Sequence, residues 1–403
     1  PLMKEFQFDQ IIDRKNTNSL KYDFAVERNM PKDVLPLWVA DMDFPAPEPV
    51  LTALQRAVSH GIFGYSETKH DYVQTLENWF LQRHNWRIEP KWLVKSPGIV
   101  YALAMAVRAF TKENDAVLIQ PPVYYPFSQV VKGNNRKLVT NPLVLENGKY
   151  KMDFADFEEK IVINHVKCFI LCNPHNPVGR VWTKDELLCI GDICQRYGVI
   201  VISDEIHQDF IYPGHQHSVF AAIHPEFQDF TVTCTAPSKT FNLAGLQVSN
   251  IFIPNDVLRR KFQREVERSG YSQLNTLGLV ACQAAYDKGT DWLEALKLYL
   301  QENLQLVRQF LQEKMPVVRL IEPEGTYLIW LDFRALGLSE ENLEHFIVND
   351  AKLWLDKGTM FGIEGSGFER INIACPKSIL IQALQQLYLA YQKLSLHKPE
   401  SGV

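Results

Sequence analysis

The strongest constraint on the fold is a series of short apolar runs in the middle of the chain, separated by helix-like segments. The runs are rich in β-branched residues, as in "VIVIS" at 199–203 and "FTVTC" at 230–234. Similar runs occupy 116–120, 167–172 and 250–253. Continuous apolar strands that alternate with helices are typical of a mostly parallel sheet with helices on both faces. We therefore predict an α/β fold.

The segments around these runs show helical periodicity. In "PEPVLTALQRAVSHG", Val50, Leu54 and Val58 follow the spacing of an amphipathic helix. "IVYALAMAVRAF" at 99–110 is apolar on nearly every side, which predicts a buried helix. After about residue 290 the pattern changes to a long amphipathic helix over roughly 290–314, followed by predicted strands at 326–333 and 371–375.

The length of 403 residues allows two or three domains. The change in pattern near residue 290 predicts a large domain over 46–290 and a smaller α+β domain over 291–403. The first 45 residues contain no long periodic segment, and we expect them to pack with the smaller domain.

Composition excludes several classes of protein. The net charge is −5 and no block of basic residues stands out, which argues against nucleic acid or an anionic membrane as a partner. No apolar run approaches the roughly 18 residues that a membrane span needs. The seven cysteines are scattered without a CxxC pair, so we expect reduced thiols and a cytoplasmic location. The "HQH" at 215–217 lacks the spacing of a metal motif, and we interpret it as a polar loop with no metal site.

Four of the predicted strands are followed at once by unusual polar loops. These loops read "PPVYYPF", "NPHNPVGR", "DEIHQD" and "APSKTF". Open α/β sheets bind ligands beyond the carboxyl ends of their strands. One site formed by all four loops is therefore the economical hypothesis.

Lys239 lies in the last of these loops, with apolar residues on both sides. Most lysines are solvated surface charges, and a lone Ser-Lys pair carries little information. A lysine that ends a buried strand either reaches solvent or is held there uncharged or covalently bound. A desolvated lysine has a lowered pKa and can form a Schiff base.

Asp204 also ends a predicted strand. It could cap a helix, form an ion pair or bind Mg²⁺. The last use would accompany a GxxxxGK[ST] loop in a nucleotide-hydrolysing enzyme, and the chain has none. A buried aspartate can also keep a pyridinium nitrogen protonated, which suits pyridoxal phosphate (PLP).

Three other features are compatible with a ligand site, although each also has an ordinary structural reading. Asn176 lies in a turn stiffened by two prolines, where its amide could reach a ligand. "SPGIV" opens the apolar helix, so the N–H groups around Gly98, Ile99 and Val100 could hold a phosphate. Tyr124, in another proline-rich loop, is either part of the core or a platform for a ring.

Taken in order, these motifs resemble those of fold type I PLP enzymes, the aspartate-aminotransferase superfamily, and the resemblance spans nearly the whole chain. More narrowly, the sequence is similar to the MalY/PatB-type carbon–sulfur β-lyases, also called cystathionine β-lyases or cysteine-S-conjugate β-lyases. The matching stretches are "LPLWVADMDFPAPEPV", "GIFGYSE", "SPGIV", "QPPVYYPF", "CNPHNPVGR", "SDEIHQD", "APSKTFNLAGLQ" and "GFERINIACP".

The resemblance implies a role for each matching residue in a PLP site. Lys239 resembles the catalytic lysine that binds the cofactor covalently, and Asp204 resembles the partner of the pyridine nitrogen. Tyr124 would stack on the ring and contact the substrate, and Asn176 would hydrogen-bond the ring 3-oxygen. The remaining expectations are phosphate contacts from Gly98, Ile99, Val100 and Ser238, a phosphate contact from Tyr65 of a partner subunit in a homodimer, and binding of the substrate α-carboxylate by Arg370.

Two departures separate the chain from typical aminotransferases. His207 stands three residues after Asp204, where those enzymes usually carry tyrosine, and Gln247 stands eight after Lys239, where they usually carry a phosphate-binding arginine. Both resemble the β-lyase branch. They leave open how His207 contacts the ring and how the phosphate charge is balanced.

The function that the resemblance implies is PLP-dependent β-elimination of cysteine S-conjugates, which yields a thiol, pyruvate and ammonia. An aminotransferase on the same scaffold is the nearest alternative. A regulatory or binding protein that retains the PLP fold is a second alternative.

Overall fold

The computed structural model describes residues 6–396, and this part of the chain forms two compact units. Unit 1 contains the described residues up to Phe44, residues Ala295–Pro323 and those from Tyr327 onward. Unit 2 contains Pro45–Glu294 and Glu324–Thr326. The first five residues of the predicted N-terminal segment and the last seven of the predicted C-terminal domain lie outside the described residues.

Unit 2 is built around a seven-stranded sheet with the order β2-β10-β9-β8-β7-β3-β4. Its strands are β2 (Leu93–Ser96), β3 (Ala116–Ile119), β4 (Lys137–Thr140), β7 (Cys168–Cys172), β8 (Ile200–Asp204), β9 (Thr231–Thr235) and β10 (Ser249–Phe252). The run from β9 to β4 is parallel, whereas β10 is antiparallel to both of its neighbours. The prediction of a mostly parallel sheet is confirmed.

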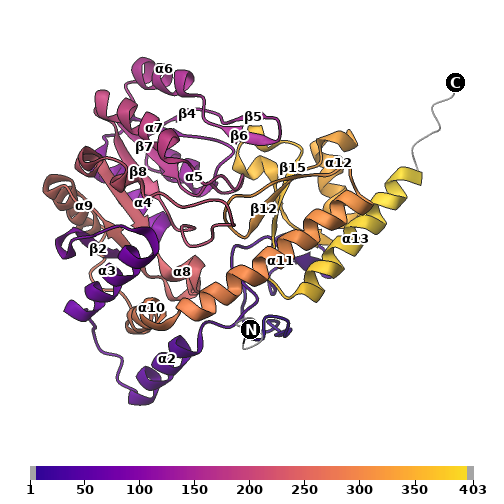
Figure 1. The fold of residues 1–403 in the computed structure, drawn as a ribbon, viewed down its shortest axis with the longest axis horizontal. Helices are drawn as coiled ribbons and strands as arrows, with labels where there is room; N and C mark the ends of the chain where they lie inside the picture. The colour runs from indigo at the N-terminus through magenta and orange to yellow at the C-terminus, as the bar shows by residue number, and fades with distance from the viewer. Residues whose placement is uncertain (1–5, 397–403) are drawn as a thin grey trace. The chain divides into compact units, whose positions relative to one another are not determined.

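Helices and a small hairpin precede, connect and follow these strands along the chain (Figure 1). The helix predicted at 99–110 is confirmed with those bounds as α4 (Ile99–Phe110). The others are α2 (Glu48–His60), α3 (His70–His84), α5 (Pro126–Gly133), α6 (Phe154–Asn164), α7 (Lys184–Arg196), α8 (Pro237–Thr240), α9 (Asp256–Arg268) and α10 (Thr276–Lys288), and the hairpin is β5 (Val144–Glu146) with β6 (Lys149–Lys151).

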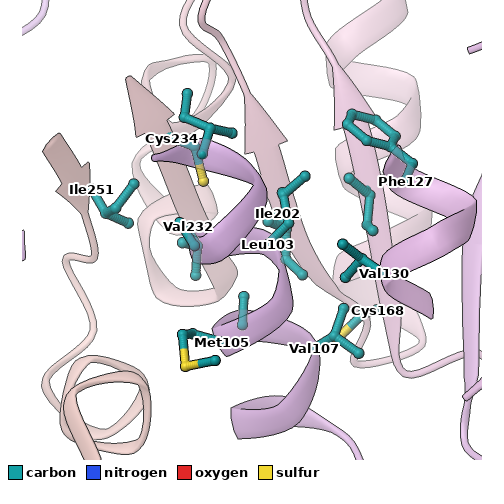
Figure 2. Packing of buried hydrophobic residues seen from close by; sticks show 14 of the residues in the cluster. Leu103, Met105, Val107, Phe127, Val130, Cys168, Ile202, Val232, Cys234 and Ile251 are labelled. Atoms are coloured by element: carbon teal, nitrogen blue, oxygen red, sulfur yellow. The ribbon is translucent and has the colours of Figure 1, made fainter. Parts of the chain in front are cut away.

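Alternate side chains of the buried strands pack against helices on opposite faces of the sheet. On one face, Leu103 and Met105 of α4 belong to the same core cluster as Ile202 and Val232 (Figure 2). On the other face, Phe169 of β7 contacts the ring of Phe157 in α6, with ring centroids 5.0 Å apart. Phe80 of α3 and Phe252 of β10 form a similar edge contact at 5.2 Å. Both faces are thus covered, as the continuous apolar strands predicted.

Unit 1 contains a four-stranded antiparallel sheet with the order β11-β12-β15-β14. The part of the long helix α11 (Thr290–Lys314) that belongs to unit 1 starts at Ala295. It lies beside α13 (Lys377–Leu396) in Figure 1, and the rings of Phe310 and Tyr388 are in contact between the two helices. The other elements of the unit are β1 (Leu35–Pro36), β11 (Arg319–Ile321), β12 (Leu328–Asp332), α12 (Glu340–His345), β13 (Leu353–Trp354), β14 (Asp356–Lys357) and β15 (Phe368–Asn372).

The strand expected at 371–375 was misplaced. In the structure it starts at Phe368 and ends at Asn372. The start was predicted too late because Glu369 and Arg370 are charged, and charged residues are rarely found in buried strands. Both are nevertheless buried, opposite Leu331 and Trp330 of β12.

No helix within residues 6–396 combines the length and the apolar character needed to cross a membrane.

Candidate active site

The carboxyl ends of the parallel strands in unit 2 lead to a cavity of about 420 Å³. Three of the four polar loops singled out from the sequence contribute to its lining, together with the start of α4. The lining residues are Pro97, Gly98, Ile99, Val100, Tyr101, Tyr124, Asp204, Ile206, Ser238, Lys239, Ala244, Gln247 and Val248. The expectation of one site shared by all four loops is therefore met by three of them, because no residue of "NPHNPVGR" belongs to the lining.

Asp204 is the last residue of β8, and its side chain is 3% exposed. In the parallel pairing it lies opposite Cys172 of β7 and Cys234 of β9. Burial among such weakly polar neighbours raises the pKa of Asp204 from 3.8 to about 7, although the N–H of Ile206 and the charge of Lys239 lower it. The cavity thus contains a carboxylate that a bound cation would stabilise.

Lys239 lies in α8, a four-residue turn that directly follows β9. Pro237 opens the turn, which fits its fixed φ, and the N–H of Phe241 closes it by bonding to the carbonyl of Pro237 at 2.9 Å. Ser238 and Lys239 are both half-buried and both line the cavity. Among the lining residues of the described chain, Lys239 is the one basic side chain and Asp204 the one acidic side chain.

The N-terminus of α4 forms another part of the wall. Gly98 precedes the helix in an extended conformation, and no side chain caps the first turn. The N–H groups at the start of an α-helix have no partners within the helix, and the helix dipole places partial positive charge there. This end of the 12-residue helix is therefore suited to an anionic group.

Tyr124 and Asn176 lie on the loops after β3 and β7. The two loops are joined by a hydrogen bond from the N–H of Tyr124 to the carbonyl oxygen of Asn176, at 3.1 Å. Tyr124 lines the cavity, whereas Asn176 and His207 are buried but do not belong to the lining set. Gln247, which replaces the expected arginine, does line it.

Two predicted site residues lie elsewhere in the chain. Tyr65 is 95% exposed and borders a separate hollow in unit 2, formed by residues 63–66 and 272–277. Arg370 belongs to unit 1, where its guanidinium is buried and Nη2 donates to Asp356 Oδ2 at 2.7 Å and to the carbonyl of Trp38 at 2.8 Å.

The sequence did not reveal a polar network on the other face of the sheet. Glu205 is buried and accepts hydrogen bonds from Ser203 Oγ at 2.8 Å and from His217 Nε2 at 2.7 Å. Residues 215–217 form a loop, as predicted from "HQH", but His217 is buried there and bonded to Glu205, which the sequence did not indicate. Asp209 and Thr240 form a second buried pair. The one signal was a high density of charged and polar residues in "SDEIHQD".

Comparison with known proteins places this site in a family. Residues 32–387 match the family model described as aminotransferase class I and II. The chain is 44% identical to cystathionine beta-lyase PatB from Bacillus subtilis over 383 residues, which cover 95% of this chain and 99% of PatB. It is 32% identical to protein MalY from Escherichia coli, with 93% of this chain and 96% of MalY covered.

A solved structure shows the same likeness in three dimensions. Cystalysin from Treponema denticola, whose crystal structure contains a pyridoxal 5'-phosphate cofactor, is 39% identical and superposes with a TM-score of 0.94. The match covers 96% of this chain and 99% of cystalysin. The chain therefore belongs to the aminotransferase class I and II family, and within it to the branch that includes PatB and MalY.

Proposed function

We propose that the chain is a PLP-dependent carbon–sulfur β-lyase that acts on cysteine S-conjugates. Cystathionine and S-alkyl-cysteines represent the substrate class, and the products are a thiol, pyruvate and ammonia. The observation that carries the proposal is the meeting of one amine, Lys239, and one buried carboxylate, Asp204, in a single cavity at the carboxyl ends of the strands. The kinship with PatB, named a cystathionine beta-lyase, supports the reaction type.

The residues present fit the cofactor. A buried carboxylate whose pKa is raised to about 7 by burial lacks sufficient positive charge around it, and a protonated pyridine nitrogen would supply that charge. The uncapped start of α4 and the Ser238 hydroxyl would hold a phosphate. Because no arginine lines the cavity within the described chain, we propose that the N–H groups of α4 balance much of the phosphate charge.

The roles of the chain's own residues follow from this arrangement. When bound, PLP supplies an electron sink for the electron pair released when the substrate loses its α-proton. Lys239 would hold the cofactor covalently, and its amine, when free, would remove the substrate α-proton as a general base. Asp204 would keep the ring nitrogen protonated, and Tyr124 would contact the ring. The substrate then loses its β-substituent as a thiolate, a good leaving group because thiols are acidic, with a pKa near ~8.5.

The overall reaction is balanced by water. The carbon–sulfur bond breaks, the sulfur leaves with a proton as R–SH, and the remaining three-carbon enamine is hydrolysed to pyruvate and ammonia. No external oxidant or keto acid takes part. Arg370 is our candidate for the substrate α-carboxylate, because a guanidinium can bind a carboxylate through two parallel hydrogen bonds.

We further propose a homodimer in which Tyr65 contacts the phosphate bound by the partner subunit. The segment around Tyr65 supports this, because Ile62, Phe63 and Tyr65 are 71%, 61% and 95% exposed in the single chain. Adjacent exposed apolar residues of this kind mark protein interfaces. Sedimentation velocity of the holoenzyme tests the proposal, and a monomer at catalytic concentrations would contradict it.

The decisive experiment separates the lyase from an aminotransferase, the function named by the family model. The purified protein with PLP is incubated with an S-alkyl-cysteine and no keto acid, and pyruvate and free thiol are measured. We expect both products in equal amounts over many turnovers. Product formation that requires an added keto acid would favour transamination, and no turnover with either addition would favour a binding or regulatory role.

A further inference from the structure

We propose that Asp209 is a positioning residue for Lys239, acting through the side chain of the next residue, Thr240. The inference rests on the proposed role of Lys239 and adds residues that neither line the cavity nor touch the reacting atoms.

The contact joins the two loops that carry the chemistry. Thr240 Oγ1 donates a hydrogen bond to Asp209 Oδ2 at 2.9 Å, and both side chains are buried. Asp209 lies five residues after Asp204 in the loop that follows β8, while Thr240 directly follows Lys239. This bond therefore limits how far the turn with the amine can move relative to the loop with the carboxylate.

The turn needs such support because it is short. Helix α8 has only four residues, so few backbone hydrogen bonds hold it. Two residues that follow the turn donate backbone hydrogen bonds to it. The N–H of Phe241 bonds to the carbonyl of Pro237, and the N–H of Leu243 bonds to the carbonyl of Ser238, both at 2.9 Å. The buried side-chain bond of Thr240, the last residue of the turn, adds a restraint to these two backbone bonds.

Asp209 is itself held firmly from α3. Its Oδ1 accepts hydrogen bonds from His84 Nε2 at 2.9 Å and from Arg83 Nε at 3.3 Å. Arg83 is held in turn by Glu294, at 2.8 Å. A carboxylate only accepts hydrogen bonds, so His84 presents its Nε2–H to Asp209. Asp209 thus connects the Lys239 turn to the last turn of a 15-residue helix.

Charge and location indicate a geometric role and exclude a proton-transfer role. Burial raises the pKa of Asp209, but the hydrogen bonds from His84 and Thr240 and the charge of Arg83 outweigh it and lower the pKa to about 2. Such a group stays ionised near neutral pH. Because general bases act best when their pKa lies near the working pH, Asp209 is unsuited to moving protons.

The test removes the hydroxyl and keeps the shape of the side chain. Thr240→Val deletes the donor, and Thr240→Ser restores it. Thr231→Val is a matched control, because Thr231 is equally buried and its hydroxyl donates to the carbonyl of Phe227 at the opposite end of β9. Thermal unfolding confirms that each variant is folded, and Thr240→Ala tests the same bond if Thr240→Val does not fold.

Two measurements are made on each variant. The first is kcat and KM of the holoenzyme with an S-alkyl-cysteine. The second is the rate at which cofactor-free protein captures PLP on Lys239, followed by absorbance and by peptide mass spectrometry after borohydride reduction. A displacement of about 1 Å costs on the order of 100-fold in rate, so we expect Thr240→Val to lower kcat by about 10- to 100-fold. KM should change by less than about 3-fold, since substrate binding is left intact.

Capture of PLP should slow at least about 5-fold in Thr240→Val, because the amine is less often correctly placed. Thr240→Ser and Thr231→Val should both match the parent protein. Unchanged kcat and capture rate in folded Thr240→Val would overturn the positioning role. If the parent protein captures no PLP on Lys239, the proposed function fails instead, so the two failures are distinguishable.

Discussion

Replacing Asp204 by asparagine should stabilise the cofactor-free protein while weakening its hold on PLP. Asp204 is 3% exposed, and burial is the largest cause of its raised pKa, which is about 7 in the folded chain against an ordinary 3.8. A neutral amide of nearly the same shape avoids that desolvation cost. With PLP bound, the same carboxylate gains a cationic partner, so the substitution should then be unfavourable.

The magnitude follows from the shift in pKa. A raised carboxyl pKa means that the folded state holds its proton more tightly than the unfolded state, so stability falls as pH rises from about 4 to about 7. At about 1.4 kcal/mol per unit, the raised pKa of Asp204 costs the fold about 1.7 kcal/mol at pH 5, where the folded carboxyl is protonated, and about 4 kcal/mol at pH 8.5, where it is ionised. Asp204→Asn should recover these amounts, so its advantage should grow by about 2 to 3 kcal/mol between the two pH values.

The assay is guanidinium unfolding of the full-length cofactor-free chain at pH 5 and pH 8.5, followed by circular dichroism. Asp209→Asn is the control with the opposite sign, because its pKa is lowered to about 2 and its ionised form stabilises the fold. That variant should lose about 2 to 3 kcal/mol at both pH values. If Asp204→Asn is no more stable than the parent at pH 8.5, or if its advantage does not depend on pH, the account of Asp204 as an uncompensated carboxylate is refuted.

Three further predictions concern the chemistry and unit 1. Lys239→Ala should abolish the chromophore of covalently bound PLP and lower kcat by more than about 100-fold, with an unchanged circular dichroism spectrum; appreciable turnover would reject its role as base. Arg370→Lys keeps the positive charge beside Asp356 but loses the planar geometry that allows two parallel hydrogen bonds to a carboxylate. KM for the amino acid should therefore rise about 10-fold with little change in kcat, and an unchanged KM would count against carboxylate binding. Glu369→Gln should raise the unfolding midpoint at pH 8 more than at pH 5, because burial and then the nearby Glu344 raise the pKa of Glu369 and its ionised form is destabilising; equal shifts at both pH values would contradict this.

Much of the fold could be predicted because its elements are defined by local pattern. Helix α4 is apolar almost all round and follows a glycine, so its bounds at Ile99 and Phe110 were readable from the sequence. The strands β7, β8 and β9 were predicted to within one residue for the same reason. The antiparallel direction of β10 was not predicted, because strand direction depends on the path of the connecting chain.

The candidate site was predictable where a charged residue lies at the end of an apolar strand. Asp204 and Lys239 are such residues, and the rule that ligands bind beyond the carboxyl ends of strands brought them together. Thr240 could not be found this way. A threonine after a lysine is an ordinary residue, and its importance depends on Asp209, which is distant in sequence and reached only through the fold.

The end of β8 shows how one strand can place a ligand-binding residue on one face of the sheet and a stabilising residue on the other. Successive side chains of a strand point to opposite faces of the sheet. Asp204 therefore shares the face of Ile202 and α4, where the cavity lies, while Glu205 points to the other face and meets His217. A charged residue placed at a buried strand end must be satisfied by hydrogen bonds. The hydrogen bonds of Glu205 restrain the backbone of the adjacent Asp204. Asp204 is thus available to a ligand, while Glu205 stabilises the strand end that positions it.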